Sequence, residues 1–296
     1  MKTLKDYIIT EASLLDIEGT LDSGDEVIKD KIEKWINDNF KVTDLKISDN
    51  PNTDGKYEVS VTDAVVTNTN NIKSLTNNMF VWNKIKKDFN CTDCPSLKSL
   101  KGAPKEVGRD FYCSRCNSLT LIEGAPEKVG GDFSCSRCNS LKSLKGAPKK
   151  VGKDFYCYDC KSLTSLEGAP KEVGRDFNCS ECKSLKSLEG APEKVGGDFI
   201  CSNCDNLSSL KYAPKEVGKN FECCGCASLT TLEGSPEKVN DFDCSKCNSL
   251  KSLKGAPKNV YGNFYCYYCD SLESTDLLKT TKIRGEIFEW KHLKTT

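Results

Sequence analysis

The sequence predicts a mainly β solenoid, an array of short coils stacked in one direction. The motif F-x-C-x-x-C occurs nine times, and successive copies are 22 residues apart except for one step of 21. The copies begin at Phe89, Phe111, Phe133, Phe155, Phe177, Phe199, Phe221, Phe242 and Phe264. One coil cannot bury its apolar face alone, whereas stacked coils share a continuous core, and about three are needed for stability.

The apolar positions within one copy predict the path of a coil. Phe155 and Cys157 alternate with polar residues, as in a short strand, and Cys160, Leu163 and Leu166 follow at intervals of three. The glycine and proline of the next segment, E-G-A-P, exclude a helix and regular strand pairing. We therefore expect a tight turn and an extended or 3₁₀ return segment, after which a valine re-enters the core.

The residues before the array predict a cap. Ser23 to Glu26 form a capping box, and apolar residues at helical spacing follow it, which predicts a helix over 24–39 that covers the first coil. A shorter amphipathic helix is expected within residues 1–22. Strands are expected at 42–48 and 57–67, with an Asn-Pro-Asn turn between them.

The expected organisation has three parts. Residues 1–55 form a helical N-terminal segment and cap, residues 56–275 form the solenoid, and residues 276–296 form a C-terminal cap with one or two edge strands. The solenoid begins with a degenerate coil, in which repeat positions are taken by Val65, Ile72, Leu75 and Ile85.

The amino-acid composition limits the classes of partner that the chain could bind. The chain has 43 basic and 43 acidic residues, so its formal net charge is zero. We therefore expect no strong electrostatic attraction to nucleic acid or to an anionic membrane. No run of 18 apolar residues is present, which predicts no membrane span. The N-terminus carries acidic residues where a signal peptide needs an apolar core, so we expect a cytoplasmic protein. The single histidine, His292, has no second histidine near it in the sequence, and we expect a surface residue.

The cysteines admit three interpretations. Eighteen of the nineteen belong to the C-x-x-C pairs, and Cys224 lies outside the pattern. The spacing between pairs fits four-cysteine zinc sites, and disulfides are a third option. We favour a reduced, buried column of thiols, because zinc would join coils in twos and nine pairs leave one over. Cys224 is expected at an exposed position, where other coils carry residues such as Ser136, Ser202 and Ser245.

The repeat unit resembles leucine-rich repeats. Its C-x-x-L-x-x-L spacing, as in Cys138, Leu141 and Leu144, resembles the Treponema/Bacteroides surface type. The segment 188–202, L-E-G-A-P through G-G-D-F-I-C-S, resembles uncharacterised repeat proteins of tailed phages more closely. Those coils usually carry asparagine where this chain has its second cysteine, which leaves an asparagine hydrogen-bond row in doubt. The resemblance implies a solenoid fold and, if the chain is phage-encoded, a place in the host cytoplasm or on the virion.

The exposed face of the strands is the candidate site. The residues after each phenylalanine and after each first cysteine vary while the core positions stay constant, and aromatic and arginine side chains are common interface anchors. The predicted partner-binding residues are Tyr112, Arg115, Arg137, Tyr156, Tyr158, Tyr265, Tyr267 and Tyr268. Alternatively, the tyrosines only cover the sheet.

These patterns predict a non-enzymatic interaction or structural scaffold that binds a protein partner. No nucleophile–base pair or phosphate loop can be assembled from the sequence, and no cofactor is expected. The alternative function is a metal-binding module, with zinc or a cluster held by stacked C-x-x-C pairs.

Overall fold

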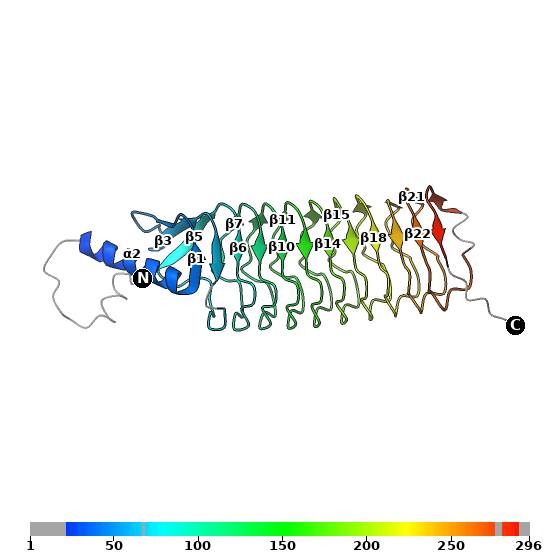
Figure 1. Ribbon diagram of the computed structural model, residues 1–296, viewed down its shortest axis with the longest axis horizontal. Helices are drawn as coiled ribbons and strands as arrows, with labels where there is room; N and C mark the ends of the chain where they lie inside the picture. The colour runs from blue at the N-terminus through cyan, green and yellow to red at the C-terminus, as the bar shows by residue number, and fades with distance from the viewer. Residues whose placement is uncertain (1–21, 67–68, 276–279, 290–296) are drawn as a thin grey trace.

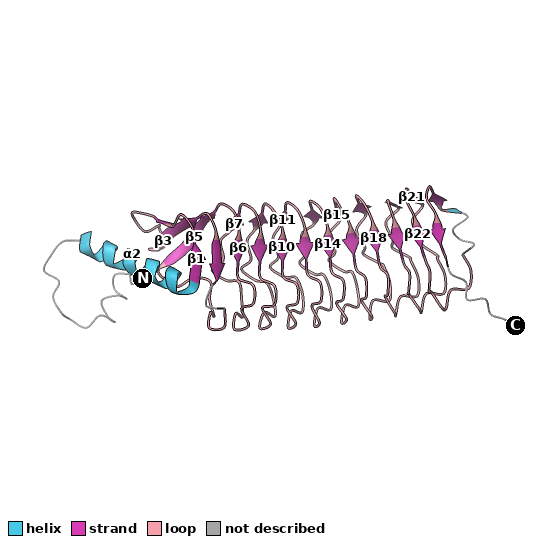
Figure 2. Cartoon of the chain, viewed as in Figure 1, coloured by secondary structure: helices cyan, strands magenta, loops and turns pink. Residues whose placement is uncertain are grey.

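The computed structural model describes residues 22–66, 69–275 and 280–289. It shows an elongated solenoid of stacked coils with a helix at the N-terminal end (Figure 1). Strands form two sides of each coil, and loops form the rest (Figure 2). The prediction of a mainly β solenoid with a helical N-terminal cap is therefore confirmed.

The first side of the solenoid is a 12-stranded sheet. All neighbouring pairs are parallel except β1–β4, and each phenylalanine lies in register with the phenylalanine of the next copy. Its strands are β1 (Phe40–Val42), β4 (Ala64–Val66), β6 (Phe89–Asn90), β8 (Phe111–Tyr112), β10 (Phe133–Ser134), β12 (Phe155–Tyr156), β14 (Phe177–Asn178), β16 (Phe199–Ile200), β18 (Phe221–Glu222), β20 (Phe242–Asp243), β22 (Phe264–Tyr265) and β24 (Ile287–Phe288).

The second side is a pair of shorter sheets that the sequence did not predict. The expected extended return segments pair with one another through their Lys/Glu-Val dipeptides. Nine strands form one sheet: β2 (Lys46–Ile47), β3 (Tyr57–Val61), β5 (Phe80–Ile85), β7 (Glu106–Val107), β9 (Lys128–Val129), β11 (Lys150–Val151), β13 (Glu172–Val173), β15 (Lys194–Val195) and β17 (Glu216–Val217). Three more form a separate sheet: β19 (Lys238–Val239), β21 (Asn259–Val260) and β23 (Lys282–Ile283).

Phenylalanine, cysteine and leucine columns fill the interior. All nine repeat phenylalanines have no exposed surface, and their rings stack on one another with centroids 5.1–5.5 Å apart. In-register parallel strands impose this stacking, because each residue lies directly over its equivalent. The eighteen paired cysteines are buried as well.

The second cysteine of each pair has a specific structural role. In the eight pairs from Cys113 and Cys116 onward, the Sγ of the second cysteine donates to the carbonyl of the first cysteine in the preceding coil, at 3.1–3.3 Å, whereas Cys94 Sγ donates to the Thr92 carbonyl at 3.6 Å. A free thiol is a small apolar group with a weak S–H donor. The second cysteine therefore supplies a donor to a buried backbone carbonyl of the neighbouring coil.

A row of aspartates runs beside the phenylalanines. The Oδ1 of each accepts the backbone N–H of its equivalent in the next coil, for example Asp132 N to Asp110 Oδ1 at 2.9 Å and Asp154 N to Asp132 Oδ1 at 3.1 Å. Asn220 and Asn263 continue the row with the same bond. The side chains of the V-G-x-D-F segment thus join successive coils.

The helix α2 (Asp22–Asn39) closes the N-terminal end, as predicted. Ile32 and Ile36 are fully buried, and the Trp35 ring packs against Phe40 and Phe80 at centroid distances of 5.9 and 5.5 Å. The helix starts before Ser23, the predicted capping residue, a difference of the size that helix boundaries commonly show.

The strands that follow differ from the prediction. The segments expected at 42–48 and 57–67 each split between the two sheets, as β1 and β2 and as β3 and β4, because the chain turns a corner inside each. Ala64 lies in register with Phe89, so Val65 points outward and is 40% exposed. The expectation that Val65 occupies a core position is wrong, whereas Ile72, Leu75 and Ile85 are buried as predicted.

The C-terminal end carries one incomplete coil. Ile287 and Phe288 of β24 lie in register with Phe264 and Tyr265, and both are exposed because no further described coil covers them. The short helix expected within residues 1–22 lies outside the described residues except for residue 22. Trp290 and His292 also lie outside the described residues.

Candidate partner-binding surfaces

All eight predicted site residues lie on the outer face of the 12-stranded sheet or in the turn that follows it. Tyr112, Tyr156 and Tyr265 are the second residues of β8, β12 and β22, and each is half-buried. The other five lie in the turns between the paired cysteines: Arg115, Arg137, Tyr158, Tyr267 and Tyr268. The structure thus brings them to one side of the molecule, spread along its length.

The turn between the paired cysteines has a left-handed residue in every repeat coil. The residues and φ angles are Asp93 58°, Arg115 57°, Arg137 58°, Asp159 52°, Glu181 60°, Asn203 57°, Gly225 68°, Lys246 60° and Tyr268 57°. The backbone N–H groups of the first eight, Asp93 to Lys246, donate to the next coil, as in Arg115 N to Ser136 O at 2.9 Å, so stacking favours the conformation there. We call these nine residues the left-handed column.

Five of the nine positions in the left-handed column hold residue types that this conformation disfavours. Glycine, asparagine and aspartate adopt it most readily, and other L-residues are strained by roughly 1–2 kcal/mol. The column nevertheless includes Arg115, Arg137, Glu181, Lys246 and Tyr268, all exposed. These side chains therefore oppose the stability of the fold at their positions.

The half-buried tyrosines are anchored to the aspartate row. Tyr112 OH donates to Asp110 Oδ2 at 3.1 Å, and Tyr156 OH donates to Asp154 Oδ2 at 3.0 Å. Burial and the neighbouring carboxylate raise the pKa of Tyr112 to about 12, and the same two causes raise the pKa of Tyr156. Each half-buried ring thus has its hydroxyl occupied by a hydrogen bond, which also fits the interpretation that these tyrosines cover the sheet.

The two arginines form local contacts at the surface. Arg115 makes a two-pronged ion pair with Asp93, and the Arg137 Nε lies 3.7 Å from Asp159 Oδ2. The Arg137 guanidinium also lies over the Tyr158 ring, 5.5 Å from its centroid. Exposed ion pairs contribute about 0–1 kcal/mol, so these arginines remain available to a partner.

An aromatic cluster occupies the C-terminal end of the face. Tyr265 stacks on Phe288 at a centroid distance of 4.8 Å, and Tyr267 meets Tyr268 edge-on at 5.4 Å. The Asn263 amide donates to Tyr265 OH at 2.9 Å and fixes that ring. Phe288 was expected only as part of a cap, because its register with Tyr265 cannot be read from the irregular spacing of the last coil.

The position after each first cysteine is less exposed than predicted. Ser136, Ser202 and Ser245 are buried, and Cys224 is only partly exposed. The cause is that small side chains here pack between coils, as in the hydrogen bond of 2.8 Å that joins Ser114 Oγ and Ser134 Oγ. Burial also raises the pKa of Cys224, which lowers the thiolate fraction.

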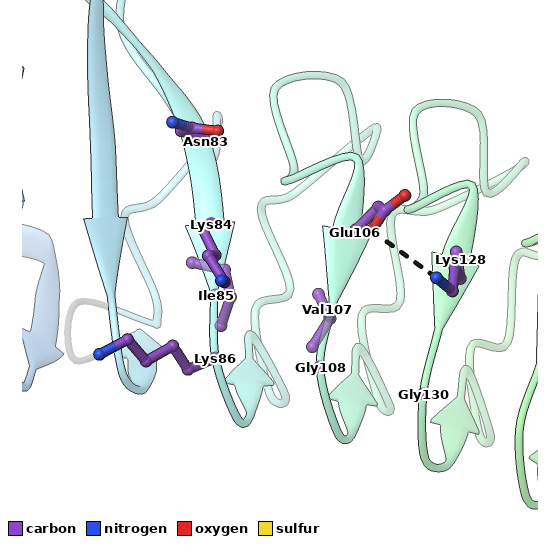
Figure 3. Close-up of a pocket in the computed structure, with 9 residues that line it drawn as sticks. All are labelled: Asn83, Lys84, Ile85, Lys86, Glu106, Val107, Gly108, Lys128 and Gly130. Atoms are coloured by element: carbon purple, nitrogen blue, oxygen red, sulfur yellow. Dashed lines mark ion pairs between the residues drawn. The ribbon is translucent and has the colours of Figure 1, made fainter.

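The second sheet carries shallow grooves on its outer side. One, of about 710 Å³, crosses β5, β7 and β9 (Figure 3). Its lining residues are Asn83, Lys84, Ile85, Lys86, Glu106, Val107, Gly108, Lys128 and Gly130. Neighbouring coils pack backbone to backbone here and leave no room for a side chain, since a Cβ at Gly130 would lie 2.1 Å from the Gly108 carbonyl oxygen. The Glu106–Lys128 ion pair, at 3.9 Å, bridges two of the strands.

The geometry and the pKa values of the cysteine columns bear on the zinc interpretation. Among the described residues no group of three or more His, Cys, Asp or Glu side chains is arranged to hold a metal ion. Burial raises the pKa of first-position thiols such as Cys113, Cys135 and Cys157, whereas hydrogen bonds with neighbouring thiols lower the pKa of the second-position thiols Cys116, Cys226 and Cys269.

The fold and the surface together define a β solenoid whose 12-stranded sheet has an outer face lined by aromatic and charged side chains. No family model and no curated protein matches the chain. Among solved structures, a crystal structure of a leucine-rich repeat protein from Bacteroides ovatus is 15% identical, with a TM-score of 0.21, and the match covers 85% of this chain and 100% of that chain. That TM-score is too low for the match to carry an argument. Among the described residues, no helix combines the length and the apolar character needed to cross a membrane.

Proposed function

We propose that the protein is a non-enzymatic interaction scaffold that binds a protein partner through the outer face of the 12-stranded sheet. The observation that carries this proposal is the left-handed column. Arg115, Arg137 and Tyr268 adopt a conformation that glycine would adopt without strain. Residues that oppose folding and remain exposed are retained for contacts outside the fold.

The chemistry of the face suits a protein partner. Tyrosine and arginine dominate interface hot spots, and here the rings of Tyr112, Tyr156 and Tyr265 are pre-oriented by hydrogen bonds. A pre-oriented side chain loses little conformational freedom when it binds. The aromatic cluster around Tyr268 and Phe288 supplies the apolar part of such an interface.

The resemblance of segment 188–202 to tailed-phage repeat proteins supports a phage-encoded scaffold acting in the host cytoplasm or on the virion. A metal-binding module is the second candidate, and the C-x-x-C spacing is what favours it. We place it second because each second cysteine already donates to a backbone carbonyl.

The test replaces left-handed residues by glycine. The triple variant Arg115→Gly, Arg137→Gly and Tyr268→Gly keeps the backbone conformation and removes the side chains. We expect it to remain folded and to lose at least tenfold in affinity for the protein recovered with the wild-type chain from lysate.

The matched control removes three exposed side chains from the second sheet, Lys128→Ala, Lys150→Ala and Glu172→Ala, and should bind that protein as the wild type does. Equal affinity of both triple variants for every recovered protein would refute binding through this face.

A further inference from the structure

Two acidic side chains lie next to each other on the outer face of the 12-stranded sheet. Glu222 is the second residue of β18, Asp243 is the second residue of β20, and parallel pairing places the two in register. In the other strands from β6 to β22 this position is uncharged: Asn90, Tyr112, Ser134, Tyr156, Asn178, Ile200 and Tyr265. Like charges directly opposite each other on neighbouring strands are destabilising, so the pair opposes the stacking of its two coils.

Glu222 has no partner that offsets its charge. Charges on the second sheet can meet a charge of opposite sign in the neighbouring coil, as Lys149 meets Glu127 and Lys194 meets Glu216, both at 3.2 Å. The half-buried Glu222 carboxylate, in contrast, makes neither an ion pair nor a hydrogen bond with any residue that the structure describes. Its charge is therefore partly removed from water without compensation.

The groups around Glu222 add negative charge. The titratable groups that face it are Asp176 and Asp198 from the two preceding coils, Cys224 from its own coil, and Asp241 and Asp243 from the next coil. Asp198 and Asp241 belong to the aspartate row, and the Oδ1 of each accepts a backbone N–H of the next coil, at 2.9 and 2.7 Å. Lys219, in the same coil as Glu222, is exposed and forms no ion pair with it in the described part of the chain.

The charge of Asp243 is not needed for the turn that follows it. Its Oδ1 accepts the Ser245 N–H at 2.8 Å. Asn90 and Asn178 accept the equivalent N–H with a neutral amide, each at 2.9 Å. The turn thus requires an acceptor but no charge, and the second carboxylate of the pair has no structural task in its own coil.

A proton reverses the sign of the interaction between the two side chains. A protonated carboxyl donates a hydrogen bond, and a neighbouring carboxylate accepts it in a charge-assisted bond. Two carboxylates that share a site hold one proton more tightly than an isolated carboxylate does. Burial first, and then the neighbouring aspartates, raise the pKa of Glu222.

We propose that Glu222 and Asp243 form an acid-responsive joint between two coils of the solenoid. Uptake of one proton by the pair joins the coils, and its loss towards neutral pH leaves two carboxylates that repel each other. Because the pKa of Glu222 is raised in the folded state, this contribution to stability is complete below the unfolded pKa of about 4.3 and is lost as the pH rises through the folded value. The joint acts within the fold and needs no partner.

The test compares neutral variants of the full-length protein across pH. Equilibrium urea unfolding is followed by circular dichroism between pH 4 and pH 8 for the wild type, Glu222→Gln, Asp243→Asn and the double variant. Each amide keeps the shape of the carboxylate and can donate to its neighbour. We expect each single variant to raise the urea midpoint at pH 8 by about 0.2 M.

Two further results are expected from the same series. The gain of Glu222→Gln over the wild type should shrink as the pH falls to 4, because the wild-type pair then carries its own proton. The double variant should gain less than the sum of the single variants, since one neutral side chain already removes the repulsion.

A control variant and a direct titration accompany the unfolding series. Glu172 is exposed on the second sheet and lies in register with Lys194, so Glu172→Gln removes no repulsion and should not raise the midpoint at any pH. Carboxyl carbon resonances of ¹³C-labelled glutamate give the second measurement. The Glu222 signal, assigned by its loss in Glu222→Gln, should titrate at a higher pH than free glutamate.

The proposal is overturned if Glu222→Gln leaves the midpoint at pH 8 unchanged or lowers it, if its gain persists undiminished at pH 4, or if the gains of the single variants add fully in the double variant. It is also overturned if the wild-type Glu222 signal titrates at or below the pH of free glutamate, a result that does not require the other variants to fold.

Discussion

The two cysteines of a pair are predicted to respond in opposite ways to serine and alanine. In a central coil, Cys182 Sγ donates to the Cys157 carbonyl at 3.2 Å, whereas Cys179, equally buried, has no such bond within the part of the chain that is described. Serine keeps a donor of similar size, and alanine removes it. The four single variants therefore measure what the second cysteine contributes beyond packing.

The magnitudes follow from burial and hydrogen bonding. Removal of one buried atom costs about 1 kcal/mol, and leaving a buried carbonyl unpaired adds roughly 1–3 kcal/mol. Cys182→Ala should thus lower the free energy of unfolding by about 2–4 kcal/mol, and Cys182→Ser by about 1 kcal/mol. At Cys179 the order reverses: alanine costs about 1 kcal/mol, and serine, which buries an unpaired hydroxyl, about 2–4 kcal/mol.

The assay is equilibrium urea unfolding followed by far-ultraviolet circular dichroism under reducing conditions. The midpoints are compared only where the slope of the transition is unchanged, since repeat arrays can lose cooperativity. The reasoning is refuted if serine is better tolerated than alanine at both positions, or at neither.

Four further outcomes are expected. Phe177→Ala, which empties a site between stacked rings at 5.2 and 5.5 Å, should destabilise by about 3–5 kcal/mol in the same assay, and Tyr156→Ala by about 1 kcal/mol; equal costs would reverse our assignment of the faces. Protein purified under reducing conditions should hold well under one zinc per chain by elemental analysis, and chelator should not shift its melting temperature; two or more tightly held ions would favour the metal module. A brief iodoacetamide pulse followed by peptide mapping should label Cys224 first, though slowly because burial raises its pKa, and even labelling of all pairs would contradict their burial. Tyr112 should ionise near pH 12, as followed by absorbance at 295 nm. Because its folded pKa is raised, its contribution to the free energy of unfolding is complete below pH 10 and is lost as the pH rises to about 12. Ionisation of Tyr112 at pH 10 would contradict its hydrogen bond to Asp110.

The interior of the solenoid could be predicted from short-range pattern alone. The phenylalanine, cysteine and leucine columns recur at a fixed period, and in-register stacking converts that period directly into columns. The helix α2 was predicted for a similar reason, because its capping residues and apolar spacing are local. The second sheet was missed because a two-residue strand such as Glu172–Val173 shows no alternation.

The contacts between coils could not be predicted in the same way. The bond of Asp132 to Asp154 joins residues 22 apart and needs the coils to be placed first. The left-handed turn was missed because arginine or glutamate gives no glycine or asparagine signal there.

The same backbone geometry that hides these positions from sequence analysis also provides a test of the binding role proposed for them. Each turn holds a left-handed φ, and glycine would relieve the strain at Arg115 or Tyr268 alike. A substitution to glycine at these positions should therefore raise stability while it removes a contact. That opposite response separates recognition from folding, because a side chain kept for the fold would lose stability when it is removed.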